Sequence, residues 1–430
     1  MAEADILAPV ANQAVAKVGE ADIVVGIPSY NNARTVGHVV RAVSAGLSKH
    51  FPEQRSVIIN SDGGSKDGTP QAVLASEHDG DKLLLVRHPL YTVHKITTPY
   101  HGLPGKGSAF RTIFEAADKL KAKACAVVDS DLRSITPDWI ELLVRPVLQN
   151  NFDYVAPYYR RHKYDGTITN SIVYPLTRAL YGRQVRQPIG GEFGLSPRMW
   201  KRLLAKKEDW ETDVARFGID IWMTTTALAE GVSVCQVFLG AKIHDAKDPG
   251  SDLSAMLVQV VGALFGLMEE YDKQWRTVQG SVPAPLYGFP YEVGLEPIKV
   301  NPQKMVASFQ QACKDLLSVY ESFLRPELVA DLKRLAAMPH EDFHFPDETW
   351  VMLVYEYAVA YHRRTMDRKH LLQSLTPLYI GRVASFVLET LELDDHAAEE
   401  KIEALCRVYE QLKPYLAQRW AGKEPAARFA

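Results

Sequence analysis

Cysteine is scarce in this sequence, and its few copies stand far apart. The 430 residues contain four cysteines, none of them in a C-x-x-C pair. This spacing argues against a disulfide framework and a zinc ribbon, so we expect reduced, buried thiols. Long apolar runs are also missing, because the longest, residues 255–268, falls well short of the roughly 20 residues that cross a bilayer. We expect a buried helix there.

The sequence lacks an excess of charge of either sign. Its 49 lysines and arginines against 52 acidic residues leave a net charge of -3, which argues against nucleic acid and other polyanions as partners. The composition, 47% hydrophobic and 23% charged, is typical of a globular protein with a large core. The first residues have no basic start followed by an apolar block, so no secretion signal is indicated and we expect a cytoplasmic protein.

Short apolar runs alternate with helical patterns in the first half of the chain. The runs occupy residues 23–27, 57–59, 83–86 and 124–128. Between the first two, apolar residues recur with the spacing of one helix face, at Val36, Val39, Val40, Val43 and Leu47. This order predicts an α/β fold with a mostly parallel, doubly wound sheet. Ligands bind at the carboxyl ends of the strands in such sheets, so the polar residues after each run are candidates for a site.

Helical patterns dominate from about residue 250 onward. A segment rich in proline and glycine, residues 281–302, precedes three long amphipathic patterns at residues 350–361, 371–391 and 397–416. The first follows Pro346, and the acidic residues after that proline suit a helix start. We therefore expect a leader at residues 1–20, a catalytic α/β domain at 21–250 and an all-helical C-terminal domain at 251–430, which is a candidate for homodimer formation.

The strongest chemical signal is a D-x-D motif, Asp129-Ser130-Asp131, directly after an apolar run. Two carboxylates one residue apart at a strand end can face one cavity. Their hard oxygen atoms suit Mg²⁺ or Mn²⁺, which can bridge to a diphosphate. The same residues could instead form a turn that caps the next helix, and the motif alone leaves both interpretations open.

Other polar segments follow the pattern of the D-x-D motif. Residues 28–31 (P-S-Y-N) follow the first run, and Asp62 follows the second within residues 60–69. Lys106 lies between two glycines at a helix start, where it can attract negative charge. This loop is no Walker A motif, because Tyr100 replaces the required glycine and Gly107 replaces the Ser or Thr.

Taken in order, these segments resemble the nucleotide-diphospho-sugar glycosyltransferases of the GT-A fold. Residues 186–192 (R-Q-P-I-G-G-E) are similar to a loop of the retaining members that make glycerate glycosides: mannosylglycerate synthase, glucosylglycerate synthase and glucosyl-3-phosphoglycerate synthase. In those enzymes a histidine after a strand-like run completes the metal site, and here His244 follows residues 232–239. The resemblance covers residues 22–250 and implies the same fold and metal for this chain.

The resemblance implies a role for each residue of the motifs. Nucleotide-sugar binding is implied for Pro28, Ser29, Tyr30, Asn31, Asp62, Lys106, Asp129, Ser130, Glu192 and Asp220. Acceptor binding is implied for Thr169, Gln187, Gly190 and Gly191, and metal binding for Asp131 and His244. The catalytic candidates are Glu192, Asp220 and Lys106.

The activity implied is metal-dependent, retaining transfer of glucose or mannose to D-glycerate, which makes a compatible solute. The donor is UDP-glucose, GDP-glucose or GDP-mannose, and the sequence does not choose among them. Where the phosphoglycerate enzymes carry Gly-Arg-Val-Thr, this chain has Gly-Thr-Ile-Thr at residues 166–169. The loss of that arginine at Thr167 favours free glycerate, although Arg160, Arg161 and His162 could supply charge nearby.

Several alternatives share parts of the pattern. Glucosyl-3-phosphoglycerate synthesis differs only in the acceptor. An inverting, family 2-like enzyme of polysaccharide or glycolipid synthesis should show a catalytic Asp near an acceptor helix and often a membrane-associating segment, and neither is evident. A nucleotidyltransferase would place a basic, glycine-rich loop where residues 28–31 stand. A non-catalytic scaffold remains an option for residues 300–430, where the His340 and His344 pair lacks the other ligands of a zinc site.

Overall fold

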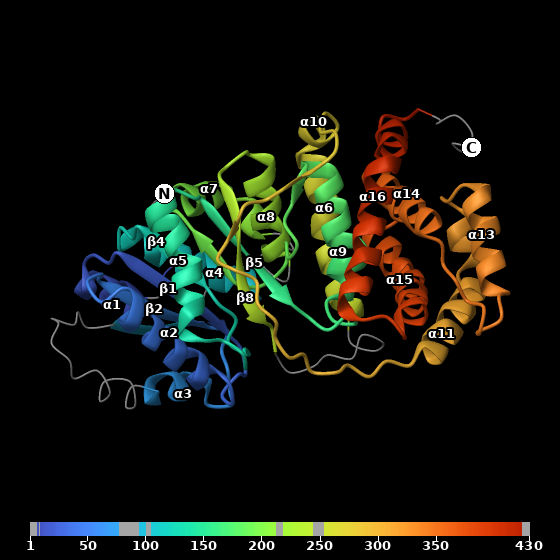
Figure 1. The fold of residues 1–430 in the computed structure, drawn as a ribbon. Coiled ribbons are helices and arrows are strands. Elements are labelled where there is room, and N and C mark those ends of the chain that lie inside the picture. Colours follow the sequence, from blue (N-terminus) through green and yellow to red (C-terminus); the bar gives the residue numbers. More distant parts are fainter. Residues whose placement is uncertain are drawn as a thin grey trace. The chain divides into compact units, whose positions relative to one another are not determined.

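The computed structural model describes residues 7, 9–76, 94–99, 105–211, 218–243 and 253–423 (Figure 1). The chain divides into two compact units. The first comprises residues 1–160, 185–246 and 284–295, and the second residues 161–184, 247–283 and 296–430. These units interleave along the sequence, whereas the sequence predicts a leader at 1–20 and one boundary near 250. That division into domains stays a prediction.

The first unit is built on an eight-stranded sheet in the order β10-β8-β5-β7-β4-β1-β2-β3. Only β7 pairs antiparallel with its neighbours among these strands. This confirms the expected α/β fold with a mostly parallel sheet. The strands are β1 (Ile23–Ser29), β2 (Ser56–Asp62), β3 (His94–Pro99), β4 (Ala124–Val127), β5 (Tyr154–Arg160), β7 (Phe193–Leu195), β8 (Val234–Ala241) and β10 (Leu286–Tyr287). The predicted strand at residues 83–86 lies outside the described residues.

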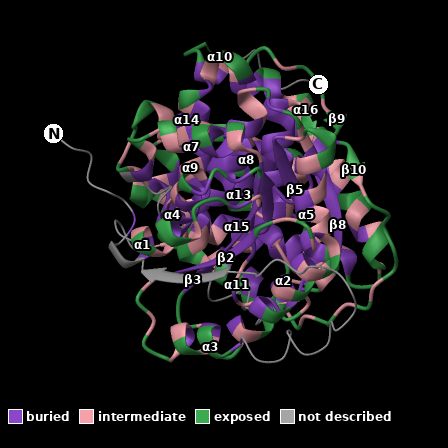
Figure 2. Ribbon diagram, turned by 90° about the vertical axis from the view of Figure 1, so that its left-hand side faces the viewer, coloured by how far each residue is buried: buried purple, intermediate pink, exposed green. Residues whose placement is uncertain are grey.

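Helices cover both faces of this sheet. On one face, α2 (Val36–His50) and α5 (Pro137–Asn150) bury their apolar side chains against β1 and β4. On the other face lies α4 (Lys106–Lys119), which approaches so closely that a Cβ added to Gly26 would lie 2.4 Å from Ile113. Strands β1 and β4 are accordingly buried along their whole length, and most of β5 and β8 has the buried colour in Figure 2. The remaining helices of the unit are α1 (Pro9–Val18), α3 (Thr69–Ala75), α7 (Pro197–Ala205), the 3₁₀ turn η2 (Asp209–Glu211) and α8 (Ile219–Ala229).

The predicted leader contains a packed helix. Leu7, Ala11 and Val15 are all buried on or just before α1. Their spacing of four residues places them on one helix face, so that α1 can bury an apolar stripe. Residues 9–18 of the predicted leader thus form a helix of the first unit.

The second unit is almost entirely helical, as predicted for the C-terminal part. Helix α9 (Ser254–Glu270) confirms the buried helix expected near residues 255–268. Helix α14 (Asp347–Arg363) begins at the acidic pair after Pro346. The other elements are η1 (Thr169–Val173), α6 (Tyr174–Tyr181), β6 (Arg183–Gln184), α10 (Asp272–Trp275), β9 (Val282–Pro283), α11 (Pro302–Asp315), α12 (Leu317–Glu321), α13 (Pro326–Ala336), α15 (Arg368–Thr390) and α16 (Asp395–Trp420).

One described helix, α15, is long and apolar enough by length and composition to cross a bilayer. Its most apolar window is 67% buried inside the structure. Core helices of globular proteins have the same character, because a helix that is buried on most sides needs few polar residues.

Candidate active site

Five charged side chains of the first unit form a row in which acids and lysines alternate. The order is Asp220, Lys106, Asp129, Lys242 and Glu192, and we call this set the acid–lysine row. Lys106 Nζ lies 3.1 Å from Asp220 Oδ2 and 2.8 Å from Asp129 Oδ1. Lys242 Nζ lies 3.1 Å from Asp129 Oδ2 and 2.9 Å from both oxygens of Glu192. Asp129, the first acid of the D-x-D motif, is therefore the centre of the row.

The row is assembled from five separate segments of the chain. Asp129 follows β4 and Lys242 follows β8, at the carboxyl ends of two strands. Lys106 and Asp220 lie in the first turns of α4 and α8, respectively. Glu192 comes immediately before β7. The sheet topology therefore brings these side chains together where the strand rule places ligand sites.

Burial and charge act in opposite directions on the pKa values of the row. Burial alone would raise the pKa of Asp129, but the attraction of Lys106 and Lys242 outweighs it and lowers that pKa well below the usual range. Burial likewise works against the charge of Lys106, yet Asp129 and Asp220 raise its pKa. For Glu192 and Asp220, burial dominates and raises the pKa. The centre of the row is thus held ionised, while its two ends take up a proton more readily than free carboxyl groups do.

The glycine loop before β7 lies directly against this row. Gly191 has φ +96°, and a Cβ added there would lie 2.2 Å from Asp129 Oδ2 and 2.9 Å from Lys242 Nζ. A Cβ on Gly190 would meet Pro157 at 2.2 Å, and the Gly190 carbonyl accepts a hydrogen bond from Lys242 at 2.6 Å. Only glycine fits at these two positions, which explains the Gly-Gly pair that the sequence singles out.

Two predicted acceptor residues lie on different units. Gln187 is buried in the first unit, and its carbonyl accepts a hydrogen bond from Gly190 at 3.1 Å. Thr169 is buried in the second unit, where it begins the π-helical turn η1. The structure thus groups Gln187, Gly190 and Gly191 with each other, and the share of Thr169 in the same site stays a prediction.

The residues predicted to bind the nucleotide form a second cluster at the ends of β1 and β2. Asp62 accepts four hydrogen bonds: from the hydroxyls of Ser29 at 3.0 Å and Ser65 at 2.6 Å, and from the amides of Gly64 at 2.9 Å and Ser65 at 2.8 Å. These bonds hold the turn after β2 against the end of β1. Tyr30 follows β1 and is 63% exposed, which suits the stacking of a base.

The connection after β1 also reaches the D-x-D motif. The Ser130 hydroxyl donates to Asn32 Oδ1 at 2.8 Å, and the Ser130 carbonyl accepts from the Thr35 hydroxyl at 2.8 Å. Asn31 adopts a left-handed conformation with φ 54° and receives a hydrogen bond on its side-chain oxygen from the Lys66 amide. The segment that contains Pro28 is thereby tied both to the second strand and to the motif.

The two predicted metal ligands differ in what the structure describes. Asp131 is half-buried, and no partner for its carboxylate is found among the described residues. An unengaged carboxylate after a strand suits a hard divalent cation. His244 lies outside the described residues, so its role stays a prediction.

Sequence analysis missed Lys242 and Tyr159. The Tyr159 hydroxyl donates a short hydrogen bond to Glu192 Oε2, and its ring centroid lies 5.4 Å from Lys242 Nζ. Lys242 stands two residues before the predicted metal ligand and just after a strand, and that position was the available signal. Tyr159 lies next to the last residue of β5, and an aromatic residue in a strand is typical of a core and indicates nothing else.

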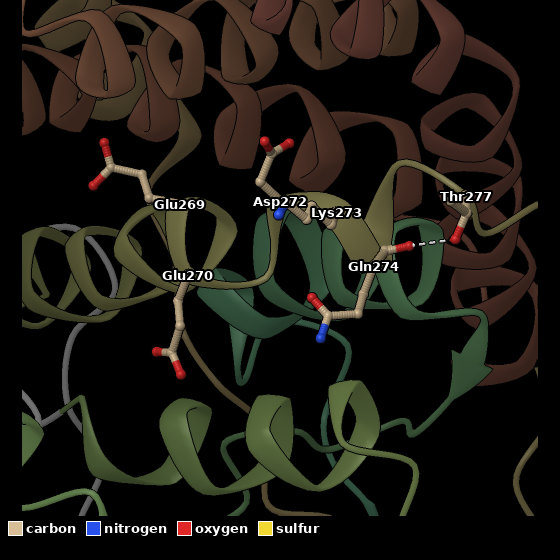
Figure 3. A pocket seen from close by; sticks show the side chains of 6 residues that line it. All are labelled: Glu269, Glu270, Asp272, Lys273, Gln274 and Thr277. Carbon is tan, nitrogen blue, oxygen red and sulfur yellow. Dashed lines mark hydrogen bonds between the residues drawn. The ribbon is translucent and has the colours of Figure 1, made fainter.

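A hollow in the second unit is lined by none of the predicted site residues. Figure 3 shows its lining, which comes from the end of α9 and from α10. It measures about 670 Å³ and is bordered by Glu269, Glu270, Asp272, Lys273, Gln274 and Thr277. Two of its acids are already paired with arginines, Glu269 with Arg368 at 2.6 Å and Asp272 with Arg276 at 3.1 Å.

A mostly parallel, doubly wound sheet with a D-x-D motif at a strand end is the arrangement expected of nucleotide-sugar glycosyltransferases of the GT-A fold. The family model described as "Mannosylglycerate synthase, GT domain" matches residues 35–266, which is more than half of the chain. The chain belongs to this family and is a glycosyltransferase. No curated protein matches it in sequence.

Solved structures with a similar fold include glucosyl-3-phosphoglycerate synthase from Mycobacterium tuberculosis. Its complex with Mn²⁺, UDP and glucosyl-3-phosphoglycerate is 22% identical, covers 60% of this chain and 83% of its own, and gives a TM-score of 0.43. Its complex with Mg²⁺ and UDP is 21% identical, with coverage of 60% and 83% and a TM-score of 0.43. Its complex with Mn²⁺, UDP-glucose and phosphoglyceric acid is 19% identical, with coverage of 61% and 84% and a TM-score of 0.43.

Proposed function

We propose that this glycosyltransferase transfers a hexose from a nucleotide diphosphate sugar to D-glycerate with retention of the anomeric configuration. The observation that carries the proposal is the acid–lysine row beside the glycine loop. It combines a lysine at a helix start, Lys106, that can meet a diphosphate with buried carboxyl groups that can accept hydrogen bonds from sugar hydroxyls. The donor is UDP-glucose, GDP-glucose or GDP-mannose.

Asp220 supplies the clearest polar group for the hexose. Its Oδ2 is engaged by Lys106, whereas its Oδ1 is buried and has no hydrogen-bond partner among the described residues. A buried, unsatisfied carboxyl oxygen costs free energy of about 1–3 kcal/mol, which a sugar hydroxyl that donates to it recovers. We therefore assign Asp220 to donor binding.

Mg²⁺ or Mn²⁺ fits Asp131, with His244 as the second ligand from the chain. When bound, the metal stabilises negative charge on the departing diphosphate. Lys106 stabilises the same negative charge from the N-terminus of α4, where the helix dipole adds to its effect. The divalent cation and the lysine thus act on the leaving group rather than on the acceptor.

We favour attack by the acceptor hydroxyl on the face of the sugar from which the diphosphate departs, with the leaving phosphate taking the acceptor proton. A covalent intermediate on Glu192 is less well supported. Lys242 lies 2.9 Å from both of its oxygens and Tyr159 donates to one of them, so neither oxygen is left for attack on the sugar. Asp220 has one oxygen that nothing in the described part of the chain engages, and it is the remaining candidate nucleophile.

Free glycerate suits the residues better than 3-phosphoglycerate. Thr167, which replaces the arginine of the phosphoglycerate enzymes, is buried and hydrogen-bonded to the Tyr379 hydroxyl. The two neighbouring arginines already face acids, because Arg160 lies 3.7 Å from Glu292 and Arg161 lies 3.7 Å from Asp165. A phosphate group would need one of them to change partners.

The direct test is a panel of the three donors, each with D-glycerate or 3-phosphoglycerate and Mg²⁺ or Mn²⁺. We expect kcat/KM to favour glycerate with one of the donors. Replacing Thr169 by Val, which keeps the shape and removes the hydroxyl, is expected to raise the acceptor KM by about tenfold and to leave the donor KM unchanged. A preference for 3-phosphoglycerate would refute the acceptor assignment and implicate Arg160 or Arg161.

Three further proposals rest on the sequence. A glycosylglycerate made in one step serves as a compatible solute, the enzyme acts in the cytoplasm, and the helical C-terminal region forms a homodimer. Size-exclusion chromatography with light scattering tests the last of these, since a monomer at working concentration would contradict it.

A further inference from the structure

Lys242 has more partners than a surface lysine and is almost completely enclosed. Its side chain is 5% exposed, and Glu192 beside it is fully buried. The ammonium group has three N–H donors. They meet acceptors on two segments of the chain: the Asp129 carboxylate at 3.1 Å after β4, and the Glu192 carboxyl group at 2.9 Å and the Gly190 carbonyl at 2.6 Å on the glycine loop. No donor of this lysine is left over for another ligand in this arrangement.

These contacts fix the distance between the glycine loop and Asp129 of the D-x-D motif. Gly190 and Glu192 flank Gly191, whose backbone lies against Asp129 so closely that no side chain fits between them. Lys242 therefore links the glycine loop to the D-x-D motif, because it bonds to Gly190 and Glu192 on either side of Gly191 and also to Asp129. Without this cation, the fully buried Glu192 and the half-buried Asp129 would each lose a positively charged partner, and a carboxylate held away from water is costly when it is unpaired.

Tyr159 completes the arrangement from β5. Its hydroxyl holds Glu192 Oε2 from the side, and its ring lies 5.7 Å from that of Trp139 on α5. Glu192 is thus restrained by a cation and by a hydroxyl whose ring is itself packed in the core. Rigid support of this kind is what a sugar-binding group needs if it is to keep one geometry before the ligand arrives.

We propose that Lys242 is a positioning residue for the donor hexose: it sets Glu192 and the Gly190–Gly191 backbone relative to Asp129, and thereby determines how tightly the sugar moiety is bound. The inference rests on the proposed function, because it assumes a nucleotide sugar as donor. Lys242 acts through these neighbours and need not touch the sugar itself. Its removal should therefore affect the sugar's contribution to binding more than the contribution of the nucleotide.

The test compares dissociation constants by isothermal titration calorimetry in the presence of Mn²⁺. UDP is compared with UDP-glucose, and GDP with GDP-mannose. The dissociation constant of the nucleoside diphosphate divided by that of the nucleotide sugar measures the contribution of the sugar to binding. For Lys242→Met we expect this ratio to fall by about tenfold, the loss typical of one charge-assisted hydrogen bond. The constant for the nucleoside diphosphate alone should change much less.

Two further variants separate positioning from a general structural effect. Glu192→Gln should lower the same ratio. The double variant Lys242→Met/Glu192→Gln should lower it by no more than about a further twofold, because Lys242 acts through Glu192 and the two changes disrupt the same interaction. The double variant leaves no buried acid without its cation, so it remains informative if Lys242→Met alone does not fold. Lys413→Met is the matched control, since Lys413 is a buried lysine in the second unit that bonds to the Val278 carbonyl at 2.7 Å. Its ratio should equal that of the wild type.

The outcomes are distinct. An unchanged ratio in Lys242→Met, or losses that multiply in the double variant, would overturn the inference while the donor assignment stands. A wild-type protein that binds the nucleotide sugars no better than the diphosphates would contradict the proposed donor and, with it, the role of Lys242.

Discussion

Asp129 and Asp131 belong to one motif but have opposite surroundings. Asp129 carries a lysine on each oxygen, at 2.8 Å and 3.1 Å. Asp131 has no partner among the described residues. The first acid therefore organises the protein, and the second is the one left for a metal. A sequence motif does not distinguish these roles, because they depend on lysines that come from distant segments.

Replacing Asp131 by Ala should abolish transfer and the metal-dependent part of nucleotide-sugar binding. Since its carboxylate supports no described contact, the free energy of unfolding should change by less than about 0.5 kcal/mol. Titration with Mn²⁺ by electron paramagnetic resonance in the presence of UDP measures the first effect, and urea unfolding the second. Asp138→Ala, which removes an exposed acid of α5, should keep metal binding. Full activity of Asp131→Ala would contradict the metal assignment.

A second residue-scale prediction concerns Lys413 in the helical unit. Burial lowers its pKa from 10.5 to about 8, against the attraction of Glu410. Between these two pH values the unfolded chain holds a proton that the folded chain has released, so stability due to this residue should rise as the pH rises. The urea midpoint of the wild type should therefore rise relative to that of Lys413→Met between pH 8 and 10.5. A constant difference across that range would show that the lysine keeps its charge on folding.

At the scale of elements, the glycine loop and the strand ends depend on each other. Gly191→Ala should destabilise the protein by about 2–4 kcal/mol, because it adds a clash with Asp129 to the cost of a left-handed backbone. Gly231→Ala is the matched control, since Gly231 also has a positive φ, +64°, but no atom within 4 Å of the added Cβ. We expect it to cost about 1 kcal/mol and to keep activity. Equal losses of stability for the two variants in urea unfolding would refute the close contact.

The sequence predicts the regular elements of the first unit where the apolar pattern is strong. The runs at 23–27, 57–59 and 124–128 correspond to β1, β2 and β4, and the stripe that begins at Val36 is buried in α2. It does not predict β7, whose three residues form an antiparallel strand between β4 and β5. Three residues are too few to show a periodicity, and that pairing is decided by long-range contacts.

The candidate site was predictable in its acids and less so in its cations. D-x-D, Gly-Lys-Gly and the glycine loop all mark residues near the row, whereas Lys242 stands in no motif of its own. An isolated lysine after a strand looks like a solvated surface residue in the sequence. Only the fold shows that its ammonium group is enclosed by Asp129, Glu192 and Gly190.

At the scale of the whole molecule, the predicted site residues are distributed over the two compact units. The first unit carries the acid–lysine row, and the second carries Thr169 in η1. The predicted acceptor residues are divided between the two units. A fragment limited to the segments of the first unit would therefore lack a predicted acceptor contact, although it would contain the donor residues.

The most direct test of the central claim is the stereochemistry of the product. The purified protein is incubated with Mg²⁺ or Mn²⁺, D-glycerate and each of UDP-glucose, GDP-glucose and GDP-mannose, and the anomeric signals are followed by NMR. We predict that one donor yields an α-linked glycosylglycerate, the configuration of the donor itself. A β-linked product would contradict the retaining mechanism, and the absence of transfer from all three donors to glycerate would contradict the proposed function.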